Sequence, residues 1–192
     1  DTFYPSEQWN LQRIDIARAW QLALTSGRFG APSSGIVVAV VDSGIDPSHP
    51  DFAGRLLPGK NYVSFDEEPS ANCKEARFNV PMLDSFGHGT QVAGIIAAAV
   101  NNGAGVAGIA PMVKIDPRRV LNCEGRGSIA DVGAAIGEAA DSGADVINLS
   151  LGGDLAPRLE EDISVIAVER ATKAGVIVVV AAGNNGPDLN TM

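Results

Sequence analysis

The sequence predicts an α/β fold, a parallel sheet flanked by helices, because short β-branched runs alternate with segments of helical spacing. The runs expected to form buried strands are 36–41, 113–115, 119–121, 146–151 and 176–180. The helical segments are 88–100, 128–142 and 158–174. In such folds the reactive groups gather beyond the carboxyl ends of the strands, so catalytic side chains are expected at those positions.

Glycines and apolar spacing define the predicted helices. Gly143 and Gly175 stand where helix C-caps belong, directly after the second and third helical segments. The third segment carries apolar side chains at helical spacing, which predicts one buried face. These residues are Ile163, Ile166, Ala167, Val168 and Ala171.

The segment 66–86 is predicted to be a surface loop, because it is polar, contains Pro69 and Pro81, and shows no clear periodicity. Its acidic run 66–68 is interpreted as a solvated face, since short acidic runs usually face water. Later in the chain, Asp116 and Arg118 interrupt an apolar stretch. If both are buried, we expect them to be paired, because an unpaired buried charge is costly.

Composition limits the class of protein. The chain has 192 residues, 45% hydrophobic and 19% charged, which predicts one globular domain with a real core. Its 14 Lys and Arg against 23 Asp and Glu give a net charge of −9, the wrong sign for a phosphate backbone, so we expect no nucleic-acid partner. The apolar runs 92–100 and 176–182 are shorter than the roughly 20 residues of a membrane span, so we expect no membrane partner.

Asp42 is the first candidate catalytic residue. It follows the apolar strand 36–41 and precedes Ser43 and Gly44, which places a carboxylate at the carboxyl end of a strand. The structural alternative is an Asx-turn that only ends the strand.

His88 is the second candidate, because it lies between glycines at the start of a small-residue helical run. A neighbouring Asp would fix the tautomer that leaves Nε2 free to act as a base. The alternative is a packed or capping histidine. The other histidine, His49, has no such setting and is interpreted as structural.

Asn184 follows the last predicted strand, and its amide could donate to the oxyanion of a tetrahedral intermediate, an interaction worth about 3 kcal/mol in such sites. A plain turn is the alternative. Two glycine-bearing stretches, 125–127 and 146–153, could pair with an extended peptide as an added strand, although either could be an ordinary loop.

Four segments together resemble the subtilisin-like serine proteases, in that family's order. They are Val-Val-Asp-Ser-Gly at 40–44, His-Gly-Thr-Gln-Val-Ala-Gly at 88–94, Ser-Leu-Gly-Gly at 150–153 and Ala-Ala-Gly-Asn at 181–184. The resemblance implies a serine endopeptidase acting on polypeptides through an Asp-His-Ser triad. Asp42 would orient His88, His88 would be the general base, and Asn184 the oxyanion donor.

The resemblance also implies substrate-binding residues, with Ile129 in the pocket for the fourth residue before the cut. They are Gly125, Arg126, Gly127, Ile129, Ser150, Leu151, Gly152 and Gly153. Aliphatic Ile129 suggests large apolar side chains in the substrate, whereas Arg126 could favour acidic ones.

A calcium ion is the cofactor that the resemblance implies, since 101–106 looks like the family's calcium loop and 48–51 like the segment that adds a carboxylate. Carboxylate, amide and carbonyl oxygens are the ligands Ca²⁺ takes. The candidates are Asp1, Asp51, Asn102 and the carbonyls of Val100, Ala104 and Val106.

The family's nucleophile motif, Gly-Thr-Ser-Met-Ala, is not present in this sequence, and no serine follows Ser164. By the family's spacing the nucleophile would fall near position 245, roughly 157 residues after the histidine. We therefore expect 1–192 to be the N-terminal part of a single catalytic domain, inactive alone, whose partner is the C-terminal remainder of the same domain.

The chain begins at Asp1 rather than Met, which favours processing, and the resemblance implies a secreted, extracellular enzyme with a propeptide. Cys73 and Cys123 fit neither a zinc site nor a redox motif, leaving one disulfide or two free thiols open.

Two other functions would use parts of this sequence. A non-catalytic, protease-like module that holds peptides or calcium is the alternative from another class. The glycines of 103–108 spell a dinucleotide-binding pattern, but that pattern must follow a strand and open a helix, and this one follows a helical run.

Overall fold

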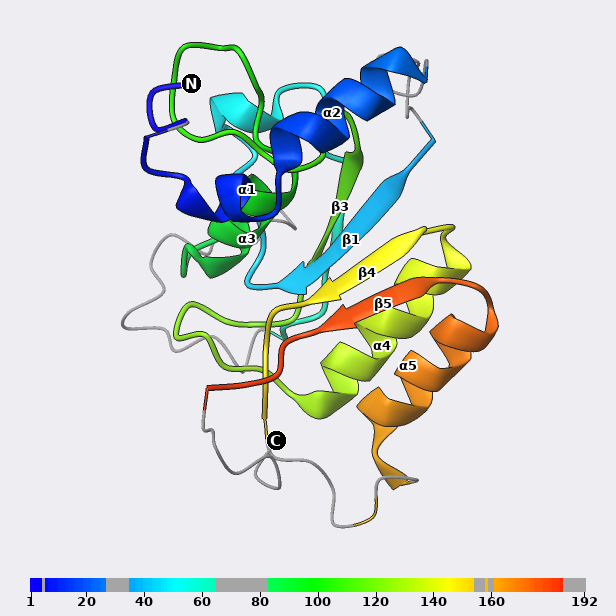
Figure 1. The fold of residues 1–192 in the computed structure, drawn as a ribbon. Helices are drawn as coiled ribbons and strands as arrows, with labels where there is room; N and C mark the ends of the chain where they lie inside the picture. The colour runs from blue at the N-terminus through cyan, green and yellow to red at the C-terminus, as the bar shows by residue number, and fades with distance from the viewer. Residues whose placement is uncertain (5, 27–34, 65–82, 154–157, 159–160, 185–192) are drawn as a thin grey trace.

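The computed structural model describes residues 1–4, 6–26, 35–64, 83–153, 158 and 161–184. Its centre is a five-stranded sheet of order β2-β3-β1-β4-β5, in which every neighbouring pair is parallel (Figure 1). The strands are β1 (Val37–Asp42), β2 (Lys60–Asn61), β3 (Lys114–Arg119), β4 (Val146–Leu149) and β5 (Ile177–Val180). The predicted fold class, a parallel sheet with flanking helices, is confirmed.

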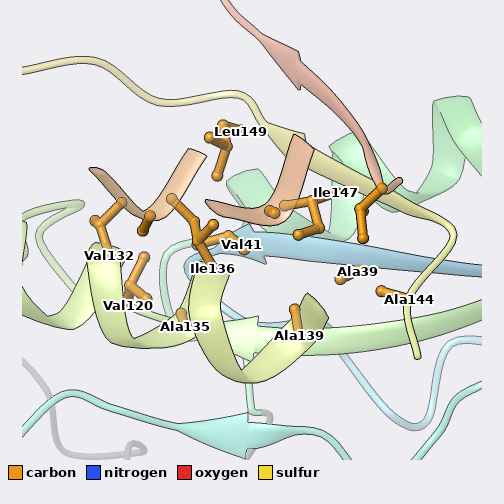
Figure 2. Close-up of a cluster of buried hydrophobic side chains, with 13 residues drawn as sticks. Ala39, Val41, Val120, Val132, Ala135, Ile136, Ala139, Ala144, Ile147 and Leu149 are labelled. Carbon is orange, nitrogen blue, oxygen red and sulfur yellow. The ribbon is translucent and has the colours of Figure 1, made fainter. Parts of the chain in front are cut away.

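Helices cover both faces of this sheet. They are α1 (Trp9–Arg13), α2 (Ile16–Thr25), α3 (His88–Ala97), α4 (Ile129–Asp141) and α5 (Ile163–Lys173), with a short 3₁₀ turn at Pro50–Phe52. Along β1 the side chains alternate: Val38 and Val40 pack with α3, whereas Ala39 and Val41 pack with α4 and α5. Figure 2 shows the cluster on the side of α4 and α5, in which Ala39 and Val41 lie with Ile147 and the small residues of α4. Strand β1 is thus buried between two layers, which explains its continuous apolar run.

The two N-terminal helices were not predicted. They are held to the body by the hydrogen bonds of two side chains, since Gln8 Nε2 donates to Ala107 O at 2.9 Å and Trp20 Nε1 donates to Ile109 O at 2.9 Å. Leu11 and Ile16 are buried against Ala107. Tertiary contacts with the segment 107–109 therefore hold these helices in place.

Strand β3 is one continuous strand, where the sequence predicted two short runs separated by a break. Pro117 lies inside it, level with Val40 of β1. On its other side the neighbouring segment pairs before and after this point, because Leu57 N donates to Ile115 O and Tyr62 N donates to Arg119 O. Every second residue of a strand directs its main-chain groups to the same neighbour, so Pro117 faces the edge segment as Ile115 and Arg119 do. The N–H that Pro117 lacks would therefore point to that edge, where no ladder bond is lost.

Asp116 and Arg118 of β3 are buried and paired, as expected. Arg118 Nε donates to Asp116 Oδ2 at 2.7 Å, and Arg118 Nη1 donates to the hydroxyl of Tyr62 at 2.9 Å. Tyr62 in turn donates to Glu138 of α4 at 3.0 Å, and Lys60 Nζ donates to the same carboxylate. This network joins the strand edge to α4.

Helix α5 is shorter than predicted, because Asp162 caps it: its Oδ1 accepts from Ser164 N at 2.9 Å. The predicted apolar face is partly wrong, since Ala167 and Ala171 are buried but Ile163 and Ile166 are each 50% exposed. The predicted helix ends are confirmed, with Gly143 at φ 86° and Gly175 at φ 92°, both left-handed.

Other predictions fall partly outside the described residues. The loop 66–86 is described only from residue 83, so its acidic run and Cys73 lie outside. Cys123 is disulfide-bonded.

The glycine pattern at 103–108 lies in the loop between α3 and β3, which agrees with rejecting a dinucleotide site. Within the described part of the chain, no helix is both long and apolar enough to cross a membrane.

Candidate active site

Asp42 is the last residue of β1, and it is fully buried. Its carbonyl accepts from Val120 N at 2.8 Å and Leu121 N at 3.2 Å, which ties it to the end of β3. Its side-chain Oδ1 accepts from Ser43 N at 2.7 Å. The carboxylate is therefore held at the carboxyl edge of the sheet, where the sequence placed it.

His88 is the first residue of α3, and the structure brings it onto Asp42. Its Nδ1 lies 2.8 Å from Asp42 Oδ1 and 2.9 Å from Oδ2. Because a carboxylate accepts only, Nδ1 carries the proton and Nε2 keeps its lone pair. The His88 side chain is 41% exposed, and among the described residues nothing bonds to Nε2. The pair can therefore take a proton from a group that approaches from solvent.

Asp84 is a site residue that sequence reasoning missed. Its carboxylate accepts from Ser43 Oγ at 2.8 Å and from Gly87 N at 2.7 Å, directly beside the pair. The signal was present, since an aspartate shortly before a predicted helix start is typical of N-terminal capping. It was hidden in a segment interpreted only as loop.

Asn122 was also missed, and it organises the glycine-bearing stretch after β3. Its side-chain Oδ1 accepts from Glu124 N at 2.9 Å and Arg126 N at 3.1 Å, and its own N–H donates to Arg126 O at 2.8 Å. Gly125, at φ 72°, lies so close to the ring of Phe86 that a β-carbon there would come within 2.7 Å. Phe86 and His88 have ring centroids 6.5 Å apart, so this stretch borders the catalytic pair.

Two more predicted substrate residues border a shallow hollow. It has a volume of about 250 Å³ and is lined by Asn122, Arg126, Gly127 and Ser128. The Arg126 side chain is 82% exposed, with Glu124 at 3.9 Å, and Ile129 opens α4 at 40% exposure. These side chains are free to contact a ligand at the surface.

The remaining predicted residues follow β4 and β5 at the same edge. Ser150 Oγ accepts from Asn148 at 2.8 Å, Leu151 is half-buried, and Gly152 and Gly153 are exposed with open space where a side chain would stand. Asn184 is exposed four residues beyond β5. In the part of the chain that is described, no hydrogen bond joins Asn184 to Asp42 or His88, so the structure assembles two of the three predicted catalytic side chains into direct contact.

Three of the predicted metal ligands lie together, away from the catalytic pair. Asp1 accepts from Asn101 N at 3.1 Å and Asn102 N at 3.2 Å, and Asn102 Nδ2 donates to Asp51 Oδ1 at 2.6 Å. A β-carbon on Gly105 would lie 3.3 Å from Asp51 Oδ2. Two carboxylates therefore face a loop rich in oxygen acceptors.

The other metal candidates are main-chain carbonyls that flank this loop. Val100 and Val106 are half-buried, and Ala104 N donates to Asn102 Oδ1 at 3.0 Å. No cluster of three or more His, Cys, Asp or Glu side chains occurs in the described residues. The donor set, two carboxylates with amide and carbonyl oxygens, fits a hard cation such as Ca²⁺ rather than a transition metal. His49 lies beside this set: its Nδ1 accepts from Asp51 N at 3.3 Å and is 4.0 Å from Asp51 Oδ2, and its ring packs on Phe52.

Comparison with known proteins places this site in a family. The model of the Subtilase family, peptidase S8, matches residues 33–192, most of the chain. The chain belongs to the subtilase family. The matched region of this subtilase runs through β1 and α3, so it includes both Asp42 and His88.

Relatives of this subtilase are serine proteases. The chain is 41% identical over 186 residues to "Thermophilic serine proteinase" of Bacillus sp. (strain AK1), covering 97% of this chain and 40% of that protein. It is 38% identical to "Thermitase" of Thermoactinomyces vulgaris, covering 97% and 58%. This subtilase chain therefore spans about half the length of such relatives.

A solved structure agrees with the fold. "Crystal structure of a cold adapted subtilisin-like serine proteinase" superposes with a TM-score of 0.64 at 30% identity, covering 82% of this chain and 50% of that one. The sheet of this subtilase is thus subtilisin-like, and the chain corresponds to about half of that structure.

Proposed function

We propose that the complete protein is a serine endopeptidase in which Asp42 orients His88 and His88 is the general base. The observation that carries this proposal is the contact of His88 Nδ1 with the buried Asp42 carboxylate at 2.8 Å, with Nε2 turned to a half-exposed position. In this arrangement Nε2 takes the proton of a serine hydroxyl as it attacks a peptide carbonyl, and later returns it to the leaving amine. Asp42 stabilises the imidazolium that forms between these steps.

The nucleophilic serine lies in our proposal outside residues 1–192, on the C-terminal remainder of the same catalytic domain. The family's serine motif is not in this sequence, and the relatives are about twice as long as the matched region. The last strand also favours a missing neighbour, because Ile177, Val179 and Val180 are 62%, 49% and 56% exposed on the strand at the sheet edge. An apolar edge strand is normally covered. The 192-residue chain alone would not turn over peptides.

The proposed substrate is a polypeptide bound as an extended strand between two stretches of this chain, 125–127 and 150–153. Exposed Gly152 and Gly153 leave room for a second backbone to approach. Ile129, at 40% exposure, would contact the fourth residue before the cut, and Arg126 would contact acidic side chains at the rim. Asn184 would donate its amide to the oxyanion, supplying about 3 kcal/mol of transition-state stabilisation.

A structural Ca²⁺ is also proposed. Asp1, Asp51 and Asn102 would hold it with the carbonyls of Val100, Ala104 and Val106. Bound there, the ion would supply charge that neutralises the two carboxylates and fastens the N-terminus to the loop after α3. It would take no part in peptide hydrolysis.

We further propose that the protein is secreted and is made with a propeptide. The disulfide bond of Cys123 supports an oxidising compartment, because cytosolic thiols are normally kept reduced. Detection of the mature N-terminus in the culture medium of the producing organism tests this, and retention of the protein inside the cells contradicts it.

The test of the proposed activity is fluorophosphonate labelling of the full-length protein in calcium, followed by denaturing intact-mass analysis. We expect label on the full-length protein and none on its His88→Ala variant, which lacks the base. The separate 192-residue chain of 19.8 kDa should stay unlabelled. A folded full-length protein that takes no label and cleaves no peptide would overturn the protease and favour a non-catalytic peptide- or calcium-binding module.

A further inference from the structure

We propose that Asp84 is a positioning residue for the reaction: its carboxylate fixes the start of α3 against the end of β1 and thereby aligns His88 with Asp42. The kinetic test of this role rests on the proposed function, whereas the hydrogen bonds from which the role is argued do not depend on that function. Asp84 touches neither His88 nor Asp42 in the hydrogen bonds of the described residues. It acts on the segments that hold them.

The start of α3 has no cap of its own. Gly87 is the N-cap residue at φ 95° and carries no side chain, so the first N–H groups of the helix need acceptors from elsewhere. Asp84 supplies the acceptor for one of them, Thr90 N, and for two N–H groups directly before the helix. Its Oδ1 accepts from Phe86 N at 3.2 Å and Gly87 N at 2.7 Å, and its Oδ2 accepts from Thr90 N at 2.8 Å. The carboxylate therefore accepts hydrogen bonds from backbone N–H groups on both sides of His88.

The same carboxylate reaches the end of β1 through Ser43. Ser43 Oγ donates to Asp84 Oδ1 at 2.8 Å and accepts from Gly89 N at 2.9 Å. Ser43 also donates its main-chain N–H to Asp42 Oδ1 at 2.7 Å. Ser43 is 1% exposed, so its hydroxyl has little access to water as a substitute partner. One side chain thus connects the two elements that carry the catalytic pair.

A second link comes through Thr90. Its Oγ1 donates to Asp84 Oδ2 at 2.6 Å and accepts from Asp46 N at 2.9 Å, on the turn that follows β1. Among the described residues, Asp84 accepts five hydrogen bonds, from Ser43, Phe86, Gly87 and twice from Thr90. An asparagine has one acceptor oxygen and would present an NH₂ group to at least one donor. Asp84→Asn therefore disrupts the network while keeping the volume.

The test uses the full-length protein with Asp84→Asn, Ser43→Ala and the double variant. Misplacing a catalytic group by about 1 Å can cost about 100-fold in rate, so we expect kcat to fall by 10- to about 100-fold in Asp84→Asn with KM nearly unchanged. Since both residues share one hydrogen bond, the double variant should lose less than the product of the two single losses. Ser43→Thr, which keeps the hydroxyl, should restore most of the rate lost in Ser43→Ala.

Asp162→Asn is the matched control. Asp162 also caps a helix, accepting from Ser164 N and Val165 N of α5, but it belongs to the layer on the opposite face of the sheet. We expect Asp162→Asn to lower the melting temperature and leave kcat intact. If Asp84→Asn lowers only the melting temperature, as Asp162→Asn does, the positioning role is overturned and Asp84 is an ordinary cap.

A spectroscopic readout separates this proposal from the proposed function. In ¹⁵N-histidine-labelled protein, the His88 Nδ1 proton bonded to Asp42 should be protected from exchange and should disappear in His88→Gln. We expect this signal to broaden in Asp84→Asn and persist in Asp162→Asn. If the full-length protein has no peptidase activity, the proposed protease function is overturned, but this signal still tests whether Asp84 aligns His88 with Asp42. An unchanged signal and unchanged kcat in Asp84→Asn overturn the proposal, and Ser43→Ala serves instead if Asp84→Asn does not fold.

Discussion

Gly89 of α3 lies against Gly44 so closely that a β-carbon on Gly89 would stand 2.1 Å from the Gly44 carbonyl oxygen. The contact is backbone to backbone, so neither side can yield without moving α3 away from the end of β1. We predict that Gly89→Ala destabilises the fold by about 1–3 kcal/mol, the usual cost of overpacking, and separates His88 from Asp42. Urea denaturation measures the first effect and loss of the protected His88 proton the second.

Gly94 provides the control for this prediction. It lies in the same helix, and a β-carbon added to it would meet nothing within 4 Å among the described residues. Gly94→Ala should therefore leave stability unchanged or raise it by about 1 kcal/mol, because alanine is the better helix former. Equal effects of the two substitutions would contradict the steric argument.

The Asp42–His88 contact predicts a large kinetic effect of Asp42→Asn in the full-length protein. An amide at this position would donate its N–H to His88 Nδ1, so that the proton of the imidazole sits on Nε2 and the base loses its lone pair there. We expect kcat for a chromogenic peptide to fall by about 10⁴-fold, as in other triads. Because the two residues act as a unit, Asp42→Asn combined with His88→Ala should be no slower than His88→Ala alone. Independent, multiplying losses would argue against the pair.

The buried pair on β3 predicts an asymmetric stability effect. Asp116 is 4% exposed and Arg118 is its ion-pair partner at 2.6 Å. Arg118→Met would leave the carboxylate buried and uncompensated, at a cost of about 3–5 kcal/mol. Replacing both, with Asp116→Leu and Arg118→Met, should recover much of that loss. Chemical denaturation compares them, and a double variant no more stable than Arg118→Met would refute this reasoning.

Tyr62 predicts how stability changes at alkaline pH. Burial, ahead of the opposing effect of Arg118, raises the pKa of Tyr62 from 10.0 to about 12. The unfolded chain therefore loses the phenol proton first, so the stabilisation from this group is complete below pH 10.0 and is lost as the pH rises toward about 12. Tyr62→Phe should show a shallower decline of unfolding free energy across this interval. Parallel curves for the two proteins would contradict the assigned pKa.

The proposed calcium site predicts a chelator effect on the melting temperature. Asp51 is 4% exposed and faces Asn102, so Asp51→Asn removes a buried carboxylate from the set. An ion at 100 times its Kd contributes about 2.7 kcal/mol, so EGTA should lower the melting temperature of the wild type and barely affect Asp51→Asn. Asp46→Asn, outside the set, should keep the full response. A wild-type melting curve that EGTA does not move would exclude the ion.

The alternation of strands and helices was enough to predict the sheet, because β1, β4 and β5 read as short apolar runs between segments of helical spacing. Asp42 and His88 were predicted because each has its own local signal, a strand end and a glycine-bounded helix start. Asp84 was missed because it lies in a segment interpreted only as loop, and its bond from Ser43, 41 residues away, exists only in the fold. Asn122 was missed although its bonds from Glu124 N and Arg126 N are local. The break predicted within β3 was wrong for two reasons. Pro117 faces a point of the neighbouring segment where no ladder bond forms, and Arg118 is hydrogen-bonded to Tyr62 outside its own strand.

The all-parallel sheet has a consequence for how this chain folds. Val37 pairs with Lys114 and Val38 with Val146, so no strand of the centre can form with a neighbour nearby in the sequence. Closing the long chain segments between these strands costs conformational entropy before the strand contacts can offset it. We therefore expect slow folding. In the folded chain β5 also presents an apolar edge to other chains. The yield of native protein should therefore depend on chain concentration during refolding, with aggregation as the competing reaction.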